Sequence, residues 1–128
     1  MISKESFLFF EFFEKVRMKV ETKKFGIEER ILDKIIEIFK KYKQVKKACI
    51  FGSRARGDYK RGSDVDICIW LEDDIENPIY KIEDELEEVD TILLFDIVVF
   101  SSITKESLKD SIIKEGVVIY ERENSREV

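Results

Sequence analysis

The stretch that decides the fold reads Phe51-Gly52-Ser53-Arg54-Ala55-Arg56-Gly57-Asp58-Tyr59-Lys60-Arg61-Gly62-Ser63-Asp64-Val65-Asp66. Short apolar runs flank it at residues 47–51 and 65–71, and both runs are predicted strands. The stretch contains a Gly-Ser turn, a ten-residue spacer and two aspartates in the pattern Asp-x-Asp, the second of which lies inside the second run. We expect the spacer to bring the chain back, so that the second strand lies beside the first.

Working outward, the rest of the 128-residue chain predicts one α+β domain around this stretch. Apolar residues at helical spacing predict helices at residues 27–43, 79–89 and 104–115, and further strands are expected at 93–100 and 117–120. This order predicts a small mixed β-sheet of about four strands with helices packed on one face. We divide the chain into a Phe-rich helical extension at residues 1–24 and a domain at residues 25–128.

Composition excludes several kinds of protein and site. The net charge of −5 disfavours a groove for long nucleic acid, and no apolar run approaches the 20 residues of a membrane span. We therefore expect a cytoplasmic protein without direct nucleic-acid binding. The chain contains no histidine, which excludes His-based triads, His general bases and His-ligated zinc. Its chemistry must use carboxylates, hydroxyls, lysine, arginine or a metal held by oxygen.

Three aspartates form the candidate metal site. Asp64 and Asp66 are two residues apart at the start of a strand, so their side chains share one face of the sheet. Two such carboxylates repel each other unless a cation lies between them, and hard oxygen ligands suit Mg²⁺, with Mn²⁺ as the alternative. Asp96 stands inside the apolar strand at 93–100, where a carboxylate is costly unless it is paired or ligates a metal. In register with the pair, it would complete a site that can hold two ions.

The Gly-Ser end of the stretch is the candidate phosphate site. Gly52 allows a ligand to approach the backbone closely, and the N–H groups and the Ser53 hydroxyl can face a phosphate. Arg54 and Arg56 have the side-chain geometry that binds phosphate, and Ser63 joins them as a candidate. Taken singly, these residues have ordinary explanations as turns or as a solvated basic face. Their combination with the three aspartates favours a catalytic site.

The pattern Gly52-Ser53-x10-Asp64-x-Asp66 resembles the signature of the minimal nucleotidyltransferases, small members of the DNA polymerase β-like superfamily. The resemblance covers about residues 27 to 121, and one departure is Arg61, where relatives often carry proline. It implies the nucleotidyltransferase fold, magnesium on Asp64, Asp66 and Asp96, and a triphosphate on Gly52 and Ser53. The implied reaction transfers a nucleoside monophosphate to a hydroxyl and releases pyrophosphate.

Many proteins with this pattern resemble the antitoxin half of HEPN–MNT toxin–antitoxin pairs. That resemblance implies ATP as substrate, a HEPN ribonuclease as partner and adenylylation of a tyrosine on it. A chain of this length has little room for a domain that holds a small acceptor, which also favours a protein acceptor. Two alternatives stay open: an antitoxin that neutralises its partner by contact without catalysis, and a stand-alone transferase for a small-molecule hydroxyl.

The same face of the predicted sheet carries apolar residues beyond the aspartates. Cys68 and Trp70 follow Asp66 at alternate positions, and Val98 and Phe100 follow Asp96. An exposed apolar patch of this kind usually has a covering element. We expect it to be covered by the N-terminal segment, by the partner or by a second copy of the chain, and the alternative is that the domain buries it internally.

Overall fold

The computed structural model describes residues 23–73 and 76–123, and the helix expected within residues 1–24 lies almost wholly outside them. The strands are β1 (Lys23–Lys24), β2 (Ile27–Glu28), β3 (Val45–Phe51), β4 (Val65–Leu71), β5 (Phe95–Val99) and β6 (Val117–Glu121). The helices are α2 (Glu29–Lys41), α3 (Ser53–Arg56), α4 (Ile79–Glu87) and α5 (Glu106–Glu115), with a 3-10 turn, η1, at Phe100–Ser102. In the described residues, no helix is long and apolar enough to cross a membrane.

Four strands form the main sheet in the order β5-β4-β3-β6. β3 pairs antiparallel with β4 and with β6, whereas β4 and β5 are parallel and are connected through α4. The predicted mixed sheet of about four strands is confirmed. The spacer after β3 returns the chain beside it as expected, because Phe51 pairs with Asp66.

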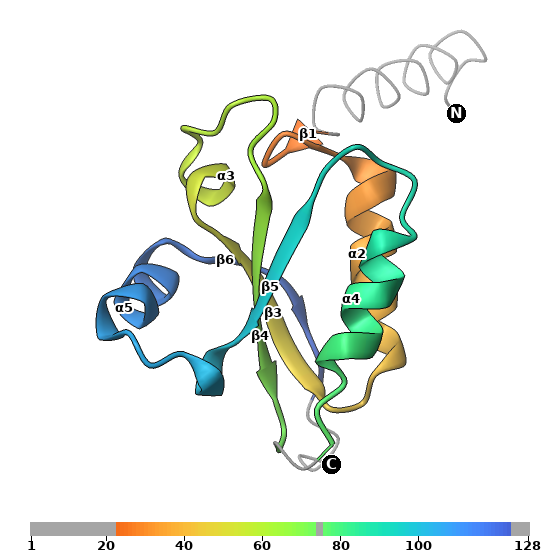
Figure 1. Cartoon of the computed structure of the whole chain (residues 1–128), viewed down its shortest axis with the longest axis vertical. Helices are drawn as coiled ribbons and strands as arrows, with labels where there is room; N and C mark the ends of the chain where they lie inside the picture. The colour runs from red at the N-terminus through yellow and green to blue at the C-terminus, as the bar shows by residue number, and fades with distance from the viewer. Residues whose placement is uncertain (1–22, 74–75, 124–128) are drawn as a thin grey trace, which may run out of the picture.

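The main core lies between this sheet and helices α2 and α4 (Figure 1). Helix α2 buries Ile31, Ile35, Ile38 and Phe39, an apolar stripe at helical spacing. From β4, Val65, Ile67 and Ile69 point into the same core. Because side chains alternate along a strand, Asp66, Cys68 and Trp70 lie on the opposite face of the sheet.

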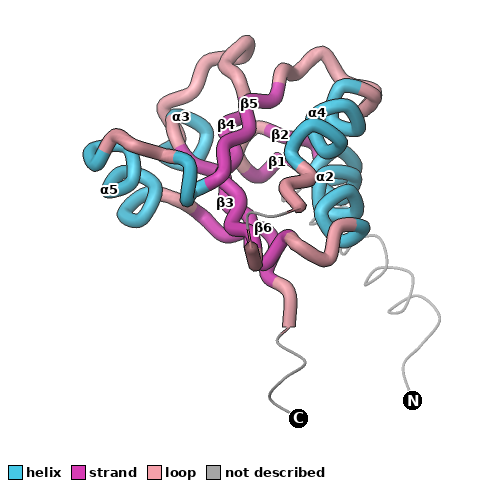
Figure 2. The backbone as a smooth tube through the Cα atoms, turned by 60° about the horizontal axis from the view of Figure 1, so that its bottom comes forward, coloured by secondary structure: helices cyan, strands magenta, loops and turns pink. Residues whose placement is uncertain are grey.

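That opposite face is covered in part by α5, so helices lie on both faces and not on one as predicted (Figure 2). Leu108 and Ile112 of α5 pack with Cys49 and Cys68 in a second, smaller cluster. The apolar patch expected beside the aspartates is therefore covered from within the domain at Cys68. Its outer members, Trp70 and Phe100, stack on each other with ring centroids 5.1 Å apart and stay half-buried.

A short hairpin that the sequence did not predict precedes α2. Strands β1 and β2 pair antiparallel around the two-residue turn Phe25-Gly26, in which both residues have positive φ. The boundary predicted between residues 24 and 25 falls at this turn. Figure 1 shows the hairpin at the same end of the sheet as α3, and the loop between α3 and β4 contacts it through Tyr59.

Candidate active site

The fold brings the Gly-Ser turn against one of the predicted aspartates. Gly52 caps α3 with φ +73° and ψ −153°, a backbone conformation found almost only in glycine. A Cβ atom at Gly52 would lie 2.5 Å from Oδ2 of Asp66, so the carboxylate occupies the space that a side chain would need. Glycine is required here both by the backbone angle and by the neighbouring carboxylate.

Asp66 also stands directly opposite Asp96. The two residues are register partners in the parallel strands β4 and β5, while Asp64 immediately precedes β4. Burial raises the pKa of Asp66 above its ordinary value, and the negative charges of Asp96 and Asp64 raise it further. Arg56 is the group that lowers the pKa of Asp66. The three predicted aspartates are therefore electrostatic neighbours.

The chemistry of these carboxylates fits a divalent cation. They are hard oxygen donors, Asp66 is half-buried, and the charges of the other two act on it unfavourably. In the described ranges, however, no group of three or more Asp, Glu, Cys or His side chains converges closely enough to enclose a metal ion. The assignment of Asp64, Asp66 and Asp96 as ligands therefore stays a prediction.

Arg56 and Ser63 lie near the carboxylates in different settings. Arg56 is about half exposed and donates from Nη1 to Oε2 of Glu115 at 3.0 Å, with a weaker contact to Asp58. These partners raise the pKa of the guanidinium, so it stays charged. The hydroxyl oxygen of Ser63 accepts a hydrogen bond from the backbone N–H of Lys60 at 2.9 Å. Phosphate binding by Arg56 and Ser63 stays a prediction, as it does for Gly52 and Ser53.

Arg54 has a different environment from the one predicted. Its side chain is buried, and its N–H groups donate to backbone carbonyl oxygens of Phe25, Gly26, Arg61 and Ser63. A guanidinium occupied in this way is not directed at a phosphate. The arrangement argues against the predicted phosphate-binding role of Arg54.

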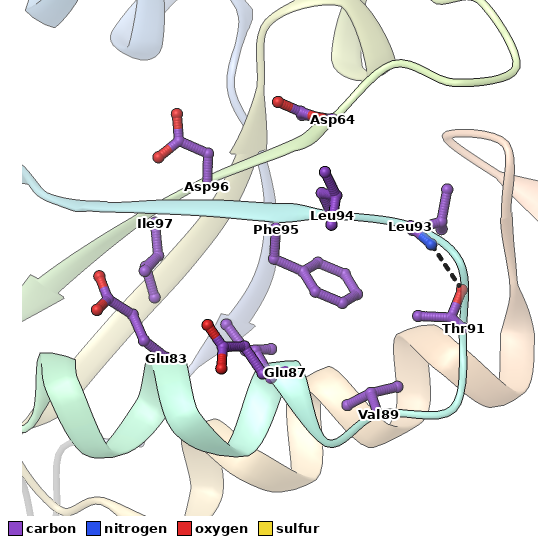
Figure 3. Close-up of a pocket in the computed structure, with 11 residues that line it drawn as sticks. Asp64, Glu83, Glu87, Val89, Thr91, Leu93, Leu94, Phe95, Asp96 and Ile97 are labelled. Carbon is purple, nitrogen blue, oxygen red and sulfur yellow. Dashed lines mark hydrogen bonds between the residues drawn. The ribbon is translucent and has the colours of Figure 1, made fainter.

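A cavity of about 480 Å³ lies between α4 and β5, and its lining includes Asp64 and Asp96. Figure 3 shows the carboxylates of these two aspartates on the side of β5 that faces away from α4. Glu83 and Glu87 line it from α4, and Figure 3 shows their carboxylates directed from the helix toward β5. Neither residue was predicted from the sequence to lie at the site. Their spacing of four residues places them on one face of a helix, and this spacing is the sequence feature that could have indicated that they line one site.

One apolar side chain that lines the same cavity is exposed. Leu94 lines it and is 70% exposed, and the nearby Ile92 is 89% exposed. The carbonyl oxygen of Leu94 accepts a hydrogen bond from the backbone N–H of Val65 at 2.8 Å, which fixes Leu94 next to Asp64. The lining of the cavity thus combines an exposed apolar side chain with carboxylates.

Comparison with known proteins places these features in context. The family "Polymerase beta, Nucleotidyltransferase" matches residues 33–125. MJ0141 of Methanocaldococcus jannaschii, a proposed protein adenylyltransferase, is 34% identical over 92 residues, which are 63% of this chain and 90% of that protein.

Solved structures with a similar fold include two toxin–antitoxin complexes. A chain of a toxin–antitoxin crystal structure with AMP-PNP matches with TM-score 0.59 and 22% identity, over 75% of this chain and 77% of that one. A chain of a complex between the tri-AMPylated Shewanella oneidensis HEPN toxin and its MNT antitoxin matches with TM-score 0.55 and 19% identity, over 77% and 76%. At these identities, the likeness is one of fold.

Proposed function

This chain belongs to the polymerase β nucleotidyltransferase family, and from that premise we propose that it adenylylates a partner protein, with ATP and Mg²⁺. The acceptor in this proposal is a tyrosine hydroxyl of a HEPN-family toxin, and the chain is the antitoxin of the pair in the cytoplasm. The proposal draws on the adenylyltransferase description of MJ0141 and on the toxin–antitoxin complexes that share the fold.

The observation that carries the proposal is the contact between the Gly52 turn and Asp66. A phosphate held by the backbone N–H groups of this turn and by the Ser53 hydroxyl would lie beside a carboxylate that is register partner to Asp96. A nucleotidyltransferase needs this juxtaposition, because the same site must hold both the phosphates and the cation that neutralises them. A Cβ atom added at Gly57 or Gly62 would meet nothing within 4 Å, so such a close approach is not a general property of the loop.

Asp64, Asp66 and Asp96 would hold magnesium in this proposal. The ion, when bound, would neutralise phosphate charge and lower the pKa of the attacking hydroxyl. Arg56 lies close enough to Asp66 to influence the pKa of that carboxylate. Of the described arginines it is therefore the one best placed to bind a phosphate, once its hydrogen bond to Glu115 is broken. The acceptor hydroxyl releases its proton to solvent and its oxygen bonds to the α-phosphorus. The bond from that phosphorus to the oxygen that bridges to the β-phosphorus breaks, and pyrophosphate leaves.

The cavity between α4 and β5 supports a protein as acceptor. Its lining includes two of the predicted metal ligands and the exposed Leu94, and exposed Ile92 lies two residues before Leu94 in the chain. Exposed apolar side chains next to a reactive centre favour contact with another polypeptide over a small polar metabolite. Glu83 and Glu87 would favour a basic residue in the part of the acceptor protein that fills the cavity.

The test incubates the protein with each of four labelled nucleoside triphosphates, Mg²⁺ and the HEPN-type product of the adjacent gene. We expect label from ATP on the partner, lost in Asp64→Ala and Asp66→Ala and kept in Asp33→Ala, which changes an exposed aspartate of α2. Neutralisation of the partner that survives loss of Asp64 and Asp66 would support the contact-only antitoxin instead. Label that appears only on an added small hydroxyl compound would support the stand-alone transferase.

A further inference from the structure

Arg54 is the one charged residue of the described chain that is buried, with 2% of its surface exposed. Nη2 and Nε donate to the carbonyl oxygen of Ser63 at 2.8 and 3.0 Å, and Nη1 donates to that of Phe25 at 3.0 Å. Longer contacts of 3.4 Å reach the carbonyl oxygens of Gly26 and Arg61. A guanidinium has five N–H donors, and these contacts use all five. Burial of the charge is offset by these hydrogen bonds, since none of the described carboxylates forms an ion pair with it.

The carbonyl groups come from two segments that are remote from each other in sequence. Phe25 and Gly26 form the turn of the β1–β2 hairpin, and Ser63 is the residue before Asp64. Arg54 itself follows Ser53, the predicted phosphate ligand, in α3. The Arg54 side chain therefore connects three parts of the chain: the Gly52-Ser53 turn, Ser63 before the Asp-x-Asp pair, and the β1–β2 hairpin. The hairpin lies before the family match at residues 33–125.

Tyr59 closes this arrangement from the loop side. Its ring lies over the Arg54 guanidinium, 4.9 Å from the ring centroid, and a Cβ atom at Gly26 would meet the ring at 2.5 Å. The hairpin turn is thus in contact with both Arg54 and Tyr59. Phe25 has φ +62°, which is unfavourable for a bulky residue and persists only where its surroundings hold it. A two-stranded hairpin of this length has little stability of its own. Ile27 of β2 anchors it in the main core, and the contacts with Arg54 and Tyr59 hold its turn.

We propose that Arg54 is a positioning residue for nucleotidyl transfer, and that the Phe25-Gly26 turn is its anchor. By holding the carbonyl of Ser63, Arg54 sets the position of Asp64 relative to the Gly52-Ser53 turn. Lysine cannot replace it, because one ammonium group lacks the planar set of five donors. The inference rests on the proposed function for one of its two readouts, and the second readout is independent of transfer.

The test compares Arg54→Lys and Arg54→Ala with the same changes at Arg122. Arg122 is a matched control, because it also donates to backbone carbonyl oxygens, those of Lys40, Tyr42 and Val45 at 3.1 to 3.3 Å, and lies over the Tyr120 ring. Its contacts lie on α2, β3 and the connection between them, and none of them involves the Asp-x-Asp loop. Each variant is assayed for kcat and for the KM of ATP, and separately for Mn²⁺ affinity by paramagnetic resonance.

We expect both Arg54 variants to lose at least tenfold in kcat and in Mn²⁺ affinity, and both Arg122 variants to stay within threefold. Ethylguanidinium, but not ethylammonium, should restore part of the kcat of Arg54→Ala. If Arg54→Ala does not fold, Gly26→Ala replaces it, because the added Cβ would collide with the Tyr59 ring. Gly26→Ala should show the same losses of kcat and Mn²⁺ affinity.

Three results would overturn the inference. An increase in the KM of ATP with unchanged kcat would make Arg54 a phosphate ligand. Equal losses in the Arg122 variants would reduce its role to general stability, and unchanged Mn²⁺ affinity in the Arg54 variants would remove its effect on Asp64. A wild-type protein that binds Mn²⁺ but transfers nothing would refute the proposed function, while the Mn²⁺ comparison would still decide the role of Arg54.

Discussion

Replacing Gly52 with alanine should separate the catalytic use of this residue from its structural cost. The added Cβ would lie 2.5 Å from Oδ2 of Asp66, whereas real contacts essentially never fall below 3.0 Å, so the carboxylate or the turn must move by at least about 0.5 Å. A misplacement of about 1 Å in a catalytic group can cost roughly 100-fold in rate. We therefore expect kcat to fall about 10- to 100-fold, equivalent to about 1.4 to 2.7 kcal/mol of transition-state stabilisation.

Gly57→Ala is the matched control for backbone strain. Gly57 also has positive φ, at +96°, but a Cβ there would have nothing within 4 Å. Both variants should lose roughly 1 to 3 kcal/mol of unfolding free energy, because both force alanine into an unfavourable backbone conformation. Urea unfolding measures this loss, and transfer of label from ATP to the partner measures kcat. Only Gly52→Ala should lose kcat by more than about threefold.

A double-mutant cycle identifies the collision itself. In Gly52→Ala/Asp66→Ala the carboxylate that the new Cβ would meet is gone, so the changes in unfolding free energy of the two single variants should be non-additive by about 1 kcal/mol or more. In Gly57→Ala/Asp66→Ala they should add within about 0.5 kcal/mol. Additive changes in unfolding free energy in the Gly52 cycle, or a Gly52→Ala protein with wild-type kcat, would refute the close contact with Asp66 as the reason for glycine.

Two further predictions concern other parts of the molecule. The Tyr42 hydroxyl and the Lys41 ammonium both bind the Glu85 carboxylate and lower its pKa, so the stability that they contribute is present above about pH 4.5 and is lost as the pH falls through the lowered pKa. Tyr42→Phe should therefore lower the free energy of unfolding by about 1 kcal/mol at pH 7. Glu85→Gln should flatten the acid side of the pH profile of the urea midpoint. A profile that is unchanged in Glu85→Gln would contradict this role of Glu85. Leu94→Ser should raise the KM for the protein acceptor about fivefold or more. The free energy of unfolding should stay within about 0.5 kcal/mol of the wild-type value, because the side chain is 70% exposed. An unchanged KM would count against the cavity as the side that binds the acceptor.

The sequence predicted the fold best where burial of one face produces a regular spacing of apolar residues. Strand β4 has the predicted bounds, residues 65–71, because its apolar residues alternate with residues that face the other side of the sheet. Leu108 and Ile112 predicted a helix correctly, since they share one helical face. Their spacing says nothing of which face of the sheet the helix covers, and α5 lies opposite α2 and α4.

The sequence was least informative where tertiary contacts decide. The β1–β2 hairpin has two-residue strands, which are too short to show a period, and its turn contacts Arg54, which is 29 positions from Phe25. Arg54 and Arg56 stand two residues apart in the same motif, and both were predicted to bind phosphate. One is buried among carbonyl groups and the other is half exposed beside Glu115, a difference that depends on where the hairpin and α5 lie.

The charge on Asp66 connects the fold to the proposed chemistry. The pKa of Asp66 is raised in the folded state, so the free energy of unfolding falls as the pH rises from the ordinary pKa near 3.8 toward the raised pKa. The ionised Asp66 carboxylate therefore destabilises the cation-free fold. Arg56 offsets part of this cost, but its guanidinium is shared with Glu115 and Asp58. The cost arises from burial and from the register that places Asp66 opposite Asp96, and the same location puts Asp66 against the Gly52 turn. The arrangement that makes this carboxylate unfavourable on its own is therefore the one that would place a cation between the aspartates and the phosphates.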